Sequence, residues 1–217
     1  KADFAIVGEP TELKALHAHK GVLRFNISTK GLACHSSTPE LGHNAIYDIS
    51  RISLLLEKYH KDLQKKKHAI LGSPSLSVGL VSGGTTVNTV PPSASIEIDR
   101  RLIPGENPDE VIEEITNLAK TIPGATVSTP HVCSLGFHEE QDGKAASELK
   151  GACACHNHQL LFTQAAFGTH APFYSENSVP SIVFGPGSIN KAHSKDEFVP
   201  LDELEKAYDI ICKILTS

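Results

Sequence analysis

The spacing of apolar and polar residues predicts a small α+β domain in the middle of the chain. Several runs alternate with the period of two that is typical of a half-buried strand, and two longer runs have the spacing of an amphipathic helix. The predicted strands are residues 22–28, 75–81, 93–102 and 125–131, and the predicted helices are residues 44–66 and 109–120. Their order is β-α-β-β-α-β, the split βαβ sandwich, in which helices cover one sheet face and leave the other for a partner.

A different pattern flanks this middle segment. A short apolar run at residues 3–7 ends in Gly-Glu-Pro-Thr, which indicates a buried strand stopped by a turn. Beyond residue 142 a helix rich in small residues, two short strands and a last helix alternate, which predicts parallel α/β structure. These later elements are the helix 145–154, the strands 160–163 and 181–184, and the helix 202–215. We expect residues 1–20 and 132–217 to form one larger domain that lacks its N-terminal part and is interrupted by residues 21–131.

The composition narrows the class of protein. Of 217 residues, 40% are hydrophobic and 21% charged, as in an ordinary globular protein, and no apolar run is long enough to span a membrane. The net charge of −5 argues against a nucleic-acid partner. The 5 cysteines are irregularly spaced and favour a reducing, cytoplasmic setting over a disulfide framework. The chain has no Met, even at position 1, so we expect it to be a piece of a longer protein.

Two residues of the flanking segments are candidate metal ligands. Glu9 stands between Gly8 and Pro10 at the end of the first predicted strand, where α/β proteins gather site residues. His193 follows a strand and a glycine-rich loop in residues 185–197. A carboxylate and an imidazole at two strand ends of one sheet would suit zinc. The alternative for Glu9 is an exposed loop glutamate without a ligand.

Three residues of the middle segment form a candidate recognition set. His35 lies between the first strand and the first helix, Asn88 lies before the strand 93–102, and Arg101 lies near the end of that strand. An imidazole, an amide and a guanidinium could together bind an anion or a carbonyl group. The alternative is a set of turn and capping residues, since Ser36 or Ser37 could simply begin the helix.

Two other clusters are weaker candidates. Residues 153–158 (Cys-Ala-Cys-His-Asn-His) contain zinc-ligand types, but neighbouring ligands on a helix diverge around its axis. The pair Glu139-Glu140 has the composition of a base and a ligand, but it follows what we interpret as an interdomain connector. We assign neither cluster a function.

Four stretches, taken together, resemble a known family. They are VGEPT (7–11), KGLACHSSTPELGHNAI (30–46), TVNTVPPSASIEIDRRLIPGE (86–106) and FGPGSINKAHSKDEFV (184–199). In this order they are similar to the two-domain metal-dependent deacylases and exopeptidases, which include acetylornithine deacetylase, succinyl-diaminopimelate desuccinylase, aminoacylase and glutamate carboxypeptidase. The stretch FGTHAPFY (167–174) and the run GPGSINKAH most resemble the acetylornithine deacetylase branch.

The resemblance implies a fold and a role for each motif residue. It implies a partial zinc-exopeptidase-like α/β catalytic domain, interrupted at residues 21–131 by a ferredoxin-like lid that forms a homodimer. Glu9 and His193 match metal ligands of a site for two zinc ions, with cobalt as an alternative metal. His35 and Asn88 match residues that act across the dimer, and Arg101 matches an arginine that holds a substrate carboxylate.

The resemblance also implies substrate contacts in the later flanking segment and a missing half. Gly168, Thr169 and Gly187 lie in stretches that match substrate-binding loops. The first half of these proteins carries a His-x-Asp motif, with the bridging metal ligand, and a Glu-Glu pair, with the general base. We expect both of these segments to be missing and no His-x-Asp string to occur in this chain, so that the fragment alone would lack the bridging ligand and the general base and would be inactive.

The implied function is removal of an acyl group from an N-acyl amino acid by metal-activated water. The remaining alternatives are succinyl-diaminopimelate desuccinylase, a dipeptidase or carboxypeptidase of the same family, and a non-catalytic dimerisation fragment.

Overall fold

The computed structural model describes residues 2–216, which divide into two compact units. The flanking unit consists of Lys1–Lys20 and Gly136–Ser217, and the inserted unit is Gly21–Leu135. The inserted unit ends four residues beyond the predicted bounds of 21–131, because residues 132–134 form a strand that pairs with its first strand. In the described part of the chain, no helix has both the length and the apolar composition to cross a bilayer.

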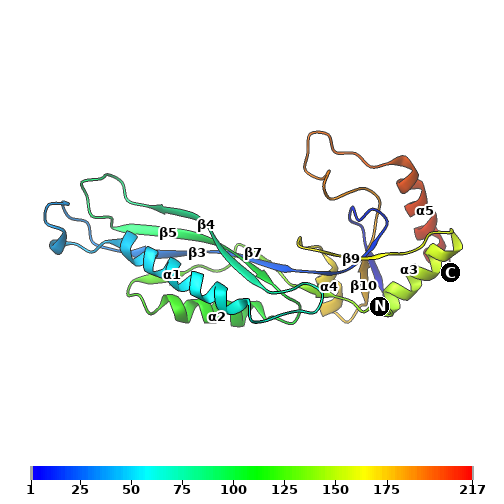
Figure 1. Ribbon diagram of the computed structural model, residues 1–217, viewed down its shortest axis with the longest axis horizontal. Coiled ribbons are helices and arrows are strands. Elements are labelled where there is room, and N and C mark those ends of the chain that lie inside the picture. Colours follow the sequence, from blue (N-terminus) through cyan, green and yellow to red (C-terminus); the bar gives the residue numbers. More distant parts are fainter. Residues whose placement is uncertain (1, 217) are drawn as a thin grey trace. The chain divides into compact units, whose positions relative to one another are not determined.

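The inserted unit has the predicted β-α-β-β-α-β order around an antiparallel sheet (Figure 1). Its sheet has the strand order β4-β5-β3-β6, and β7 also pairs with β3. Its elements are β3 (Gly21–Lys30), the short helix η1 (Pro39–Leu41), α1 (Ala45–Leu63), β4 (Ser75–Gly83), β5 (Ser93–Leu102), α2 (Pro108–Ala119), β6 (Ala125–Val127) and β7 (Val132–Ser134). The predicted strand 125–131 is therefore split. Pro130, which has no N–H to donate, lies in the gap between β6 and β7.

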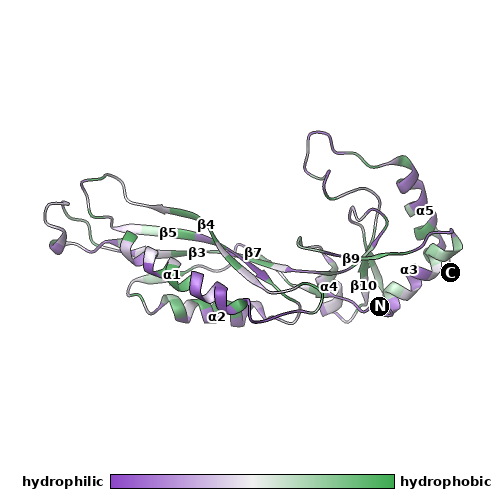
Figure 2. Cartoon of the chain, in the orientation of Figure 1, coloured by the Kyte–Doolittle hydropathy of each residue, from purple (hydrophilic) through white to green (hydrophobic). Residues whose placement is uncertain are grey.

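The core of the inserted unit lies between the sheet and its two helices. Along β3 and β5 every second residue is buried, including Phe25, Ile27 and Ile98. They pack with Ile52 of α1 and Ile115 of α2, and both helices lie over the same sheet face (Figure 1). Figure 2 shows the resulting mixture of hydrophobic and hydrophilic residues along strands and helices. The opposite face of β3 and β5 carries polar side chains.

Side chains of asparagine begin both helices of the inserted unit. The Asn44 Oδ1 accepts hydrogen bonds from the backbone N–H groups of Ile46 and Tyr47, and the Asn107 Oδ1 accepts one from Asp109. These caps satisfy donors that a helix leaves without a partner. The Asn44 cap also fixes where the loop that carries His35 ends.

The flanking unit is built on a mixed sheet of the order β1-β10-β2-β8, with β9 on the other edge of β2. Its elements are β1 (Ala5–Val7), β2 (Ala15–His19), β8 (Phe137–His138), α3 (Lys144–Cys155), β9 (Phe162–Ala165), α4 (Ala171–Glu176), β10 (Ser181–Val183) and α5 (Leu201–Leu215). Because Ile182 packs with α3 and α5 while Val183 packs with Ala171 of α4, these helices cover opposite sheet faces.

The flanking unit has the predicted α/β class, but its sheet is mixed rather than parallel throughout. β1 pairs with β10, and β2 with β9, in parallel, but β2 runs antiparallel to β10 and β8. The prediction omitted β2, β8 and α4. β2 is buried at every position, so it gives no alternation, and its two histidines make it look polar.

Both histidines of β2 are buried and lie beside backbone carbonyl oxygens. His17 Nδ1 lies 3.2 Å from the carbonyl oxygen of Glu139, and His19 Nδ1 lies 3.0 Å from that of Lys20. A carbonyl only accepts, so Nδ1 carries the proton in each ring. Burial lowers the pKa of both His17 and His19.

This burial predicts an acid-sensitive flanking unit. A histidine whose pKa is lower in the folded than in the unfolded chain binds fewer protons when folded. Stability is therefore full above the unfolded pKa of about 6.5 and falls as the pH drops toward the folded value. We expect the free energy of unfolding from urea titrations to be lower at pH 5.5 than at pH 7.5.

The matched variants for this test are His17→Asn, which keeps a donor for Glu139, and His170→Asn at an exposed position. His17→Asn should reduce the loss of stability between the two pH values, whereas His170→Asn should leave it unchanged. An equal loss in all three proteins would exclude the buried histidine as a cause.

Candidate functional site

The inserted unit brings His35 and Asn88 together at one end of its sheet. His35 lies in the loop between β3 and α1, and it forms a β-bridge with Thr89 in the loop between β4 and β5. The backbone N–H of Ser36 donates to the carbonyl oxygen of Asn88 over 3.0 Å. Both His35 and Asn88 are exposed. The backbone contacts thus hold the two loops together, with His35 and Asn88 both on the surface.

The His35 ring has a defined proton position. Its Nδ1 lies 3.2 Å from the backbone N of Ser37 and 2.8 Å from the hydroxyl of the same residue. A backbone N–H can only donate, so Nδ1 is an acceptor and the neutral ring carries its proton on Nε2. The N–H at Nε2 can donate to a carbonyl oxygen or an oxyanion.

Arg101 lies at the other end of the same sheet and is not brought together with His35 and Asn88. It pairs with Val22 of β3 and Ser75 of β4, whereas β5 begins at Ser93, close to the Asn88 loop. The eight residue-to-residue steps from Ser93 to Arg101 span about 26 Å at the rise of an extended strand.

The Arg101 guanidinium is oriented by a neighbouring carboxylate. Its Nε lies 2.6 Å from Asp99 Oδ1 and its Nη2 lies 3.2 Å from Asp99 Oδ2. The Arg24 Nε also donates to Asp99, over 2.9 Å. The three side chains lie on the face of the sheet that α1 and α2 do not cover.

The preceding residue, Arg100, points into the core and has a structural role. It is fully buried and its Nη2 pairs with Glu106 Oε1 over 2.6 Å. It also donates to the carbonyl oxygen of Arg101. The alternation of β5 therefore separates a core arginine from a surface arginine.

In the flanking unit, the turn that carries Glu9 packs against the loop after β10. The Thr11 hydroxyl and the backbone N–H of Gly185 lie 3.1 Å apart, and the backbone N of Glu12 donates to Gly187 O over 2.8 Å. A side chain at Gly185 would collide with the backbone of Glu9, since an added Cβ would lie 2.6 Å from its carbonyl oxygen. The glycine thus permits the close approach of the two stretches.

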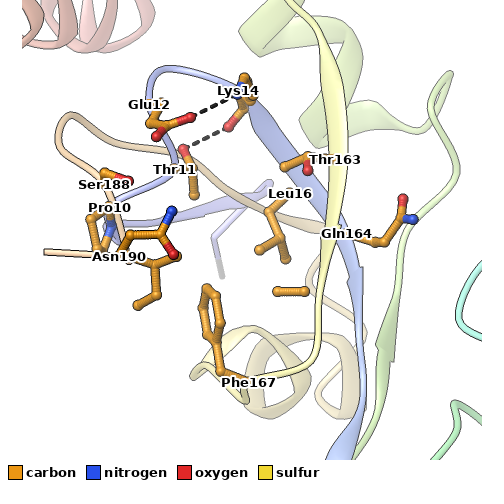
Figure 3. A pocket seen from close by; sticks show the side chains of 12 residues that line it. Pro10, Thr11, Glu12, Lys14, Leu16, Thr163, Gln164, Phe167, Ser188 and Asn190 are labelled. Carbon is orange, nitrogen blue, oxygen red and sulfur yellow. Dashed lines mark hydrogen bonds and ion pairs between the residues drawn. The ribbon is translucent and has the colours of Figure 1, made fainter. Parts of the chain in front are cut away.

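A small cavity of about 110 Å³ lies beside these two stretches (Figure 3). It is lined by the turn after Glu9, by β9 and the residues after it, and by the loop after Gly187. The lining residues are Pro10, Thr11, Glu12, Lys14, Leu16, Thr163, Gln164, Ala165, Phe167, Ser188, Ile189 and Asn190. Glu12 and Lys14 form an ion pair of 2.7 Å at its side. Chain neighbours of Glu9, Gly168 and Gly187 therefore surround one hollow.

The predicted substrate-binding residues of the flanking unit differ in their exposure and in their hydrogen-bond partners. Gly168 is exposed, and Thr169 binds the ring of His19 through its hydroxyl, over 3.0 Å. Gly187 has a φ of +87°, and its N–H already donates to Glu203 Oε2 over 2.8 Å. The sequence prediction missed His19 and Glu203, since nothing in their local sequence indicates these long-range contacts.

The two predicted metal ligands lie on the stretches just described, but they do not complete a metal site. His193 is exposed, has a φ of +58° and donates its backbone N–H to Glu197 Oε2. A positive φ at a residue other than glycine is strained and is often found at functional sites. Among residues 2–216, no group of three or more His, Cys, Asp or Glu side chains could hold a metal ion. Glu9 and His193 have suitable donor chemistry, but further ligands would be needed.

The weaker candidates form no metal site in the described residues either. Burial raises the pKa of Cys153 to about 11, which keeps it a thiol, and His158 Nε2 lies 3.0 Å from the carbonyl oxygen of Leu13. Residues 137–138, interpreted as a connector, are strand β8, and burial raises the pKa of the adjacent Glu139.

One sequence expectation needs a correction. A His-x-Asp string does occur, at residues 60–62, although we expected none. It lies in α1, where His60 Nδ1 accepts from the backbone N–H of Leu76 and Asp62 pairs with Lys65. These contacts indicate a structural role for the string.

Curated proteins of similar sequence extend beyond this chain. An acetylornithine deacetylase of Vibrio atlanticus (strain LGP32) is 30% identical over 98% of the chain and 57% of its own length. A probable carboxypeptidase of Ajellomyces dermatitidis is 34% identical over 97% of the chain and 48% of its own length. The chain thus spans about half the length of these relatives.

Solved structures share the fold at lower sequence identity. Aminopeptidase PepT from Bacillus cereus has a TM-score of 0.76 and 19% identity, covering 98% of this chain and 56% of that one. An M20 family metallo-carboxypeptidase from Sulfolobus solfataricus has a TM-score of 0.70 and 18% identity, covering 99% of this chain and 63% of that one. This chain, a partial α/β domain with an inserted ferredoxin-like domain, therefore shares its fold with a little over half of each of these two structures.

A family model also matches the chain directly. The model describes the peptidase dimerisation domain and covers residues 17–127, which include nearly all of the predicted lid. The chain therefore belongs to the M20 peptidase dimerisation domain family.

Proposed function

We propose that this chain is part of a zinc-dependent amide hydrolase that removes the acyl group from an N-acyl amino acid. Similarity to acetylornithine deacetylases over nearly the whole chain supports N-acetylornithine, or a close analogue, as the substrate. The five thiols, none of them in a disulfide, support a reducing cytoplasmic setting.

The observation that carries this proposal is the exposure of His35 together with the position of its ring proton. A solvent-exposed imidazole whose Nδ1 accepts a hydrogen bond from Ser37 N–H presents a pre-oriented donor at Nε2. In the proposed enzyme, this N–H stabilises the oxyanion that forms when water attacks the amide carbonyl.

The layout of the inserted unit supports a site shared between two protomers. His35 and Asn88 lie at one end of the β5 strand, and Arg101 lies about 26 Å along it at the rise of an extended strand. An N-acyl amino acid is too small to contact both ends of one sheet. We propose a homodimer in which Arg101 of one protomer meets His35 and Asn88 of its partner.

Each candidate residue then has a distinct role in the proposed enzyme. Arg101, already oriented by Asp99, binds the free α-carboxylate of the substrate. Gly168 and Thr169 contact the substrate from the loop after β9. Glu9 and His193 supply two of the metal ligands, and the metal lowers the pKa of water toward neutrality when it is bound.

A carboxypeptidase is the second candidate, and the 34% identity to a probable carboxypeptidase supports it.

The described residues lack a complete metal site, so we also propose that these 217 residues alone are inactive. They would then act only as a dimerisation fragment.

A substrate panel on the longer protein that contains this chain tests the function. We expect release of acetate from N-acetyl amino acids, with N-acetylornithine among the best substrates, and its loss when a chelator removes the metal. The panel includes N-succinyl amino acids and dipeptides. A preference for dipeptides would favour the carboxypeptidase, and no hydrolysis with any substrate would refute the proposal.

The substitution His35→Ala tests the oxyanion contact. Removal of one such donor lowers kcat by about 10²–10³ and should change KM little. The control is Lys58→Ala, an exposed change on α1 that should leave kcat unchanged. An unaltered kcat in His35→Ala would remove His35 from catalysis.

Mixed dimers test the same residue for action across the dimer. In a dimer of one His35→Ala and one Arg101→Ala subunit, one site keeps both residues if His35 acts on its partner. Random mixing should then restore roughly a quarter of the wild-type activity, since half of the dimers are mixed and each has one intact site. No recovery would mean that His35 serves its own protomer.

The substitution Arg101→Lys tests carboxylate recognition. Lysine keeps the charge but loses the planar fork that binds a carboxylate with two hydrogen bonds. We expect kcat/KM to fall by more than about tenfold for acylated amino acids, as for loss of a charge-assisted bond. The corresponding amides should be affected much less, and an equal fall for both would contradict the assignment.

A further inference from the structure

A single buried imidazole connects strand β2 to the loop between β9 and α4. His19 is fully buried at the end of β2, and its Nε2 lies 3.0 Å from the hydroxyl of Thr169 and 3.3 Å from the backbone N of Thr169. The two residues are 150 positions apart in the sequence. Gly168, next to Thr169, is exposed.

The polarity of this connection is fixed. His19 Nδ1 faces the carbonyl oxygen of Lys20, which only accepts, so Nδ1 carries the proton and Nε2 is an acceptor. The single lone pair of Nε2 is then shared by two donors of Thr169, the O–H at 3.0 Å and the backbone N–H at 3.3 Å. The Thr169 oxygen, having donated its proton, accepts from the backbone N–H of Ala171 over 3.1 Å. Three successive hydrogen bonds thus connect Lys20, His19, Thr169 and Ala171. In each of them, the residue nearer Ala171 in this series is the donor.

The surroundings make this connection stiff. The His19 ring lies 5.4 Å from the ring of Phe137, and Ala171, where α4 begins, is fully buried. A hydrogen bond in such a place is costly to lose because water does not replace the missing partner. A phenylalanine at position 19 would fill the same space but could not hold Thr169.

We propose that His19 is a positioning residue, which anchors the 167–170 loop so that Gly168 and Thr169 are pre-oriented to contact the substrate. This inference rests on the proposed function, in which that loop binds an N-acyl amino acid. A pre-oriented loop binds its ligand without the cost of ordering it first. Loss of the anchor should therefore raise KM more than it lowers kcat.

Two variants of His19 separate the anchor from the filling of space. Glutamine can place its side-chain oxygen near the position of Nε2 and so retain an acceptor for Thr169. Asparagine reaches only the position of Nδ1, so it keeps the contact with Lys20 and loses Thr169. Both replace the aromatic ring, so the comparison shows which contact holds the loop, the one to Thr169 or the one to Lys20.

Hydrogen exchange on the 217-residue chain tests the anchor without any activity. In His19→Asn, the amides of Thr169 and Ala171 should exchange about tenfold faster, as expected for loss of one buried hydrogen bond. His19→Gln should restore most of the protection. Amides of β3 and β5 in the inserted unit are the internal control, and the ¹⁵N shifts of the His19 ring should show Nδ1 protonated and Nε2 not.

Kinetics of the longer protein test the role of the loop in binding. We expect His19→Asn to raise KM by about tenfold, with kcat within a few fold of wild type, and His19→Gln to recover most of the change. Unchanged exchange in His19→Asn would overturn the anchor. Faster exchange with an unchanged KM would overturn the role in substrate binding.

The failure of the proposed function would be distinguishable from that of the anchor. If no panel substrate is hydrolysed by the wild-type protein, the proposed function fails, and the role of the loop in substrate binding fails with it. The exchange measurement would still support or overturn the anchor, because it needs neither metal nor substrate.

Discussion

The antiparallel ladder between β3 and β5 sets how far apart the candidate residues of the inserted unit lie. Ten residues of each strand pair without a break in register, from Gly21 with Leu102 to Lys30 with Ser93. The loops with His35 and Asn88 lie at the end near Ser93, and Arg101 lies at the other. Because the buried side of this ladder is packed against α1 and α2, it cannot fold back on itself. In the proposed enzyme, this rigid spacing makes the second protomer necessary.

The inserted unit could be predicted from the sequence in detail, and the reason is physical. One face of its sheet is buried under two helices and the other is open, so buried apolar and more exposed polar residues alternate along its strands. The observed bounds of β5, 93–102, are therefore the predicted ones. The flanking unit gives weaker signals. β2 is buried throughout, β8 has two residues and α4 has six, too few for any period to appear. Their place depends on partners far away in the sequence.

Much the same division holds for the candidate site. The types of residue in the motifs, such as Glu9 in its Gly-Glu-Pro turn, could be read from the sequence. The contacts of these residues could not. No local pattern indicates that Thr169 binds His19, that the N–H of Gly187 is taken by Glu203, or that Asp99 orients Arg101. Such hydrogen bonds join side chains brought together only by the complete fold.

The described residues also suggest a division of labour within the proposed enzyme. Zinc sites need at least three protein ligands, and residues 2–216 contain no group of three that could hold a metal. What the chain does contain is a set of oriented donors. His35 presents Nε2–H, Arg101 presents a guanidinium fixed by Asp99, and His19 holds the loop of Gly168. In our proposal, this chain therefore orients the substrate and its oxyanion, while the groups that activate water come largely from the rest of the protein.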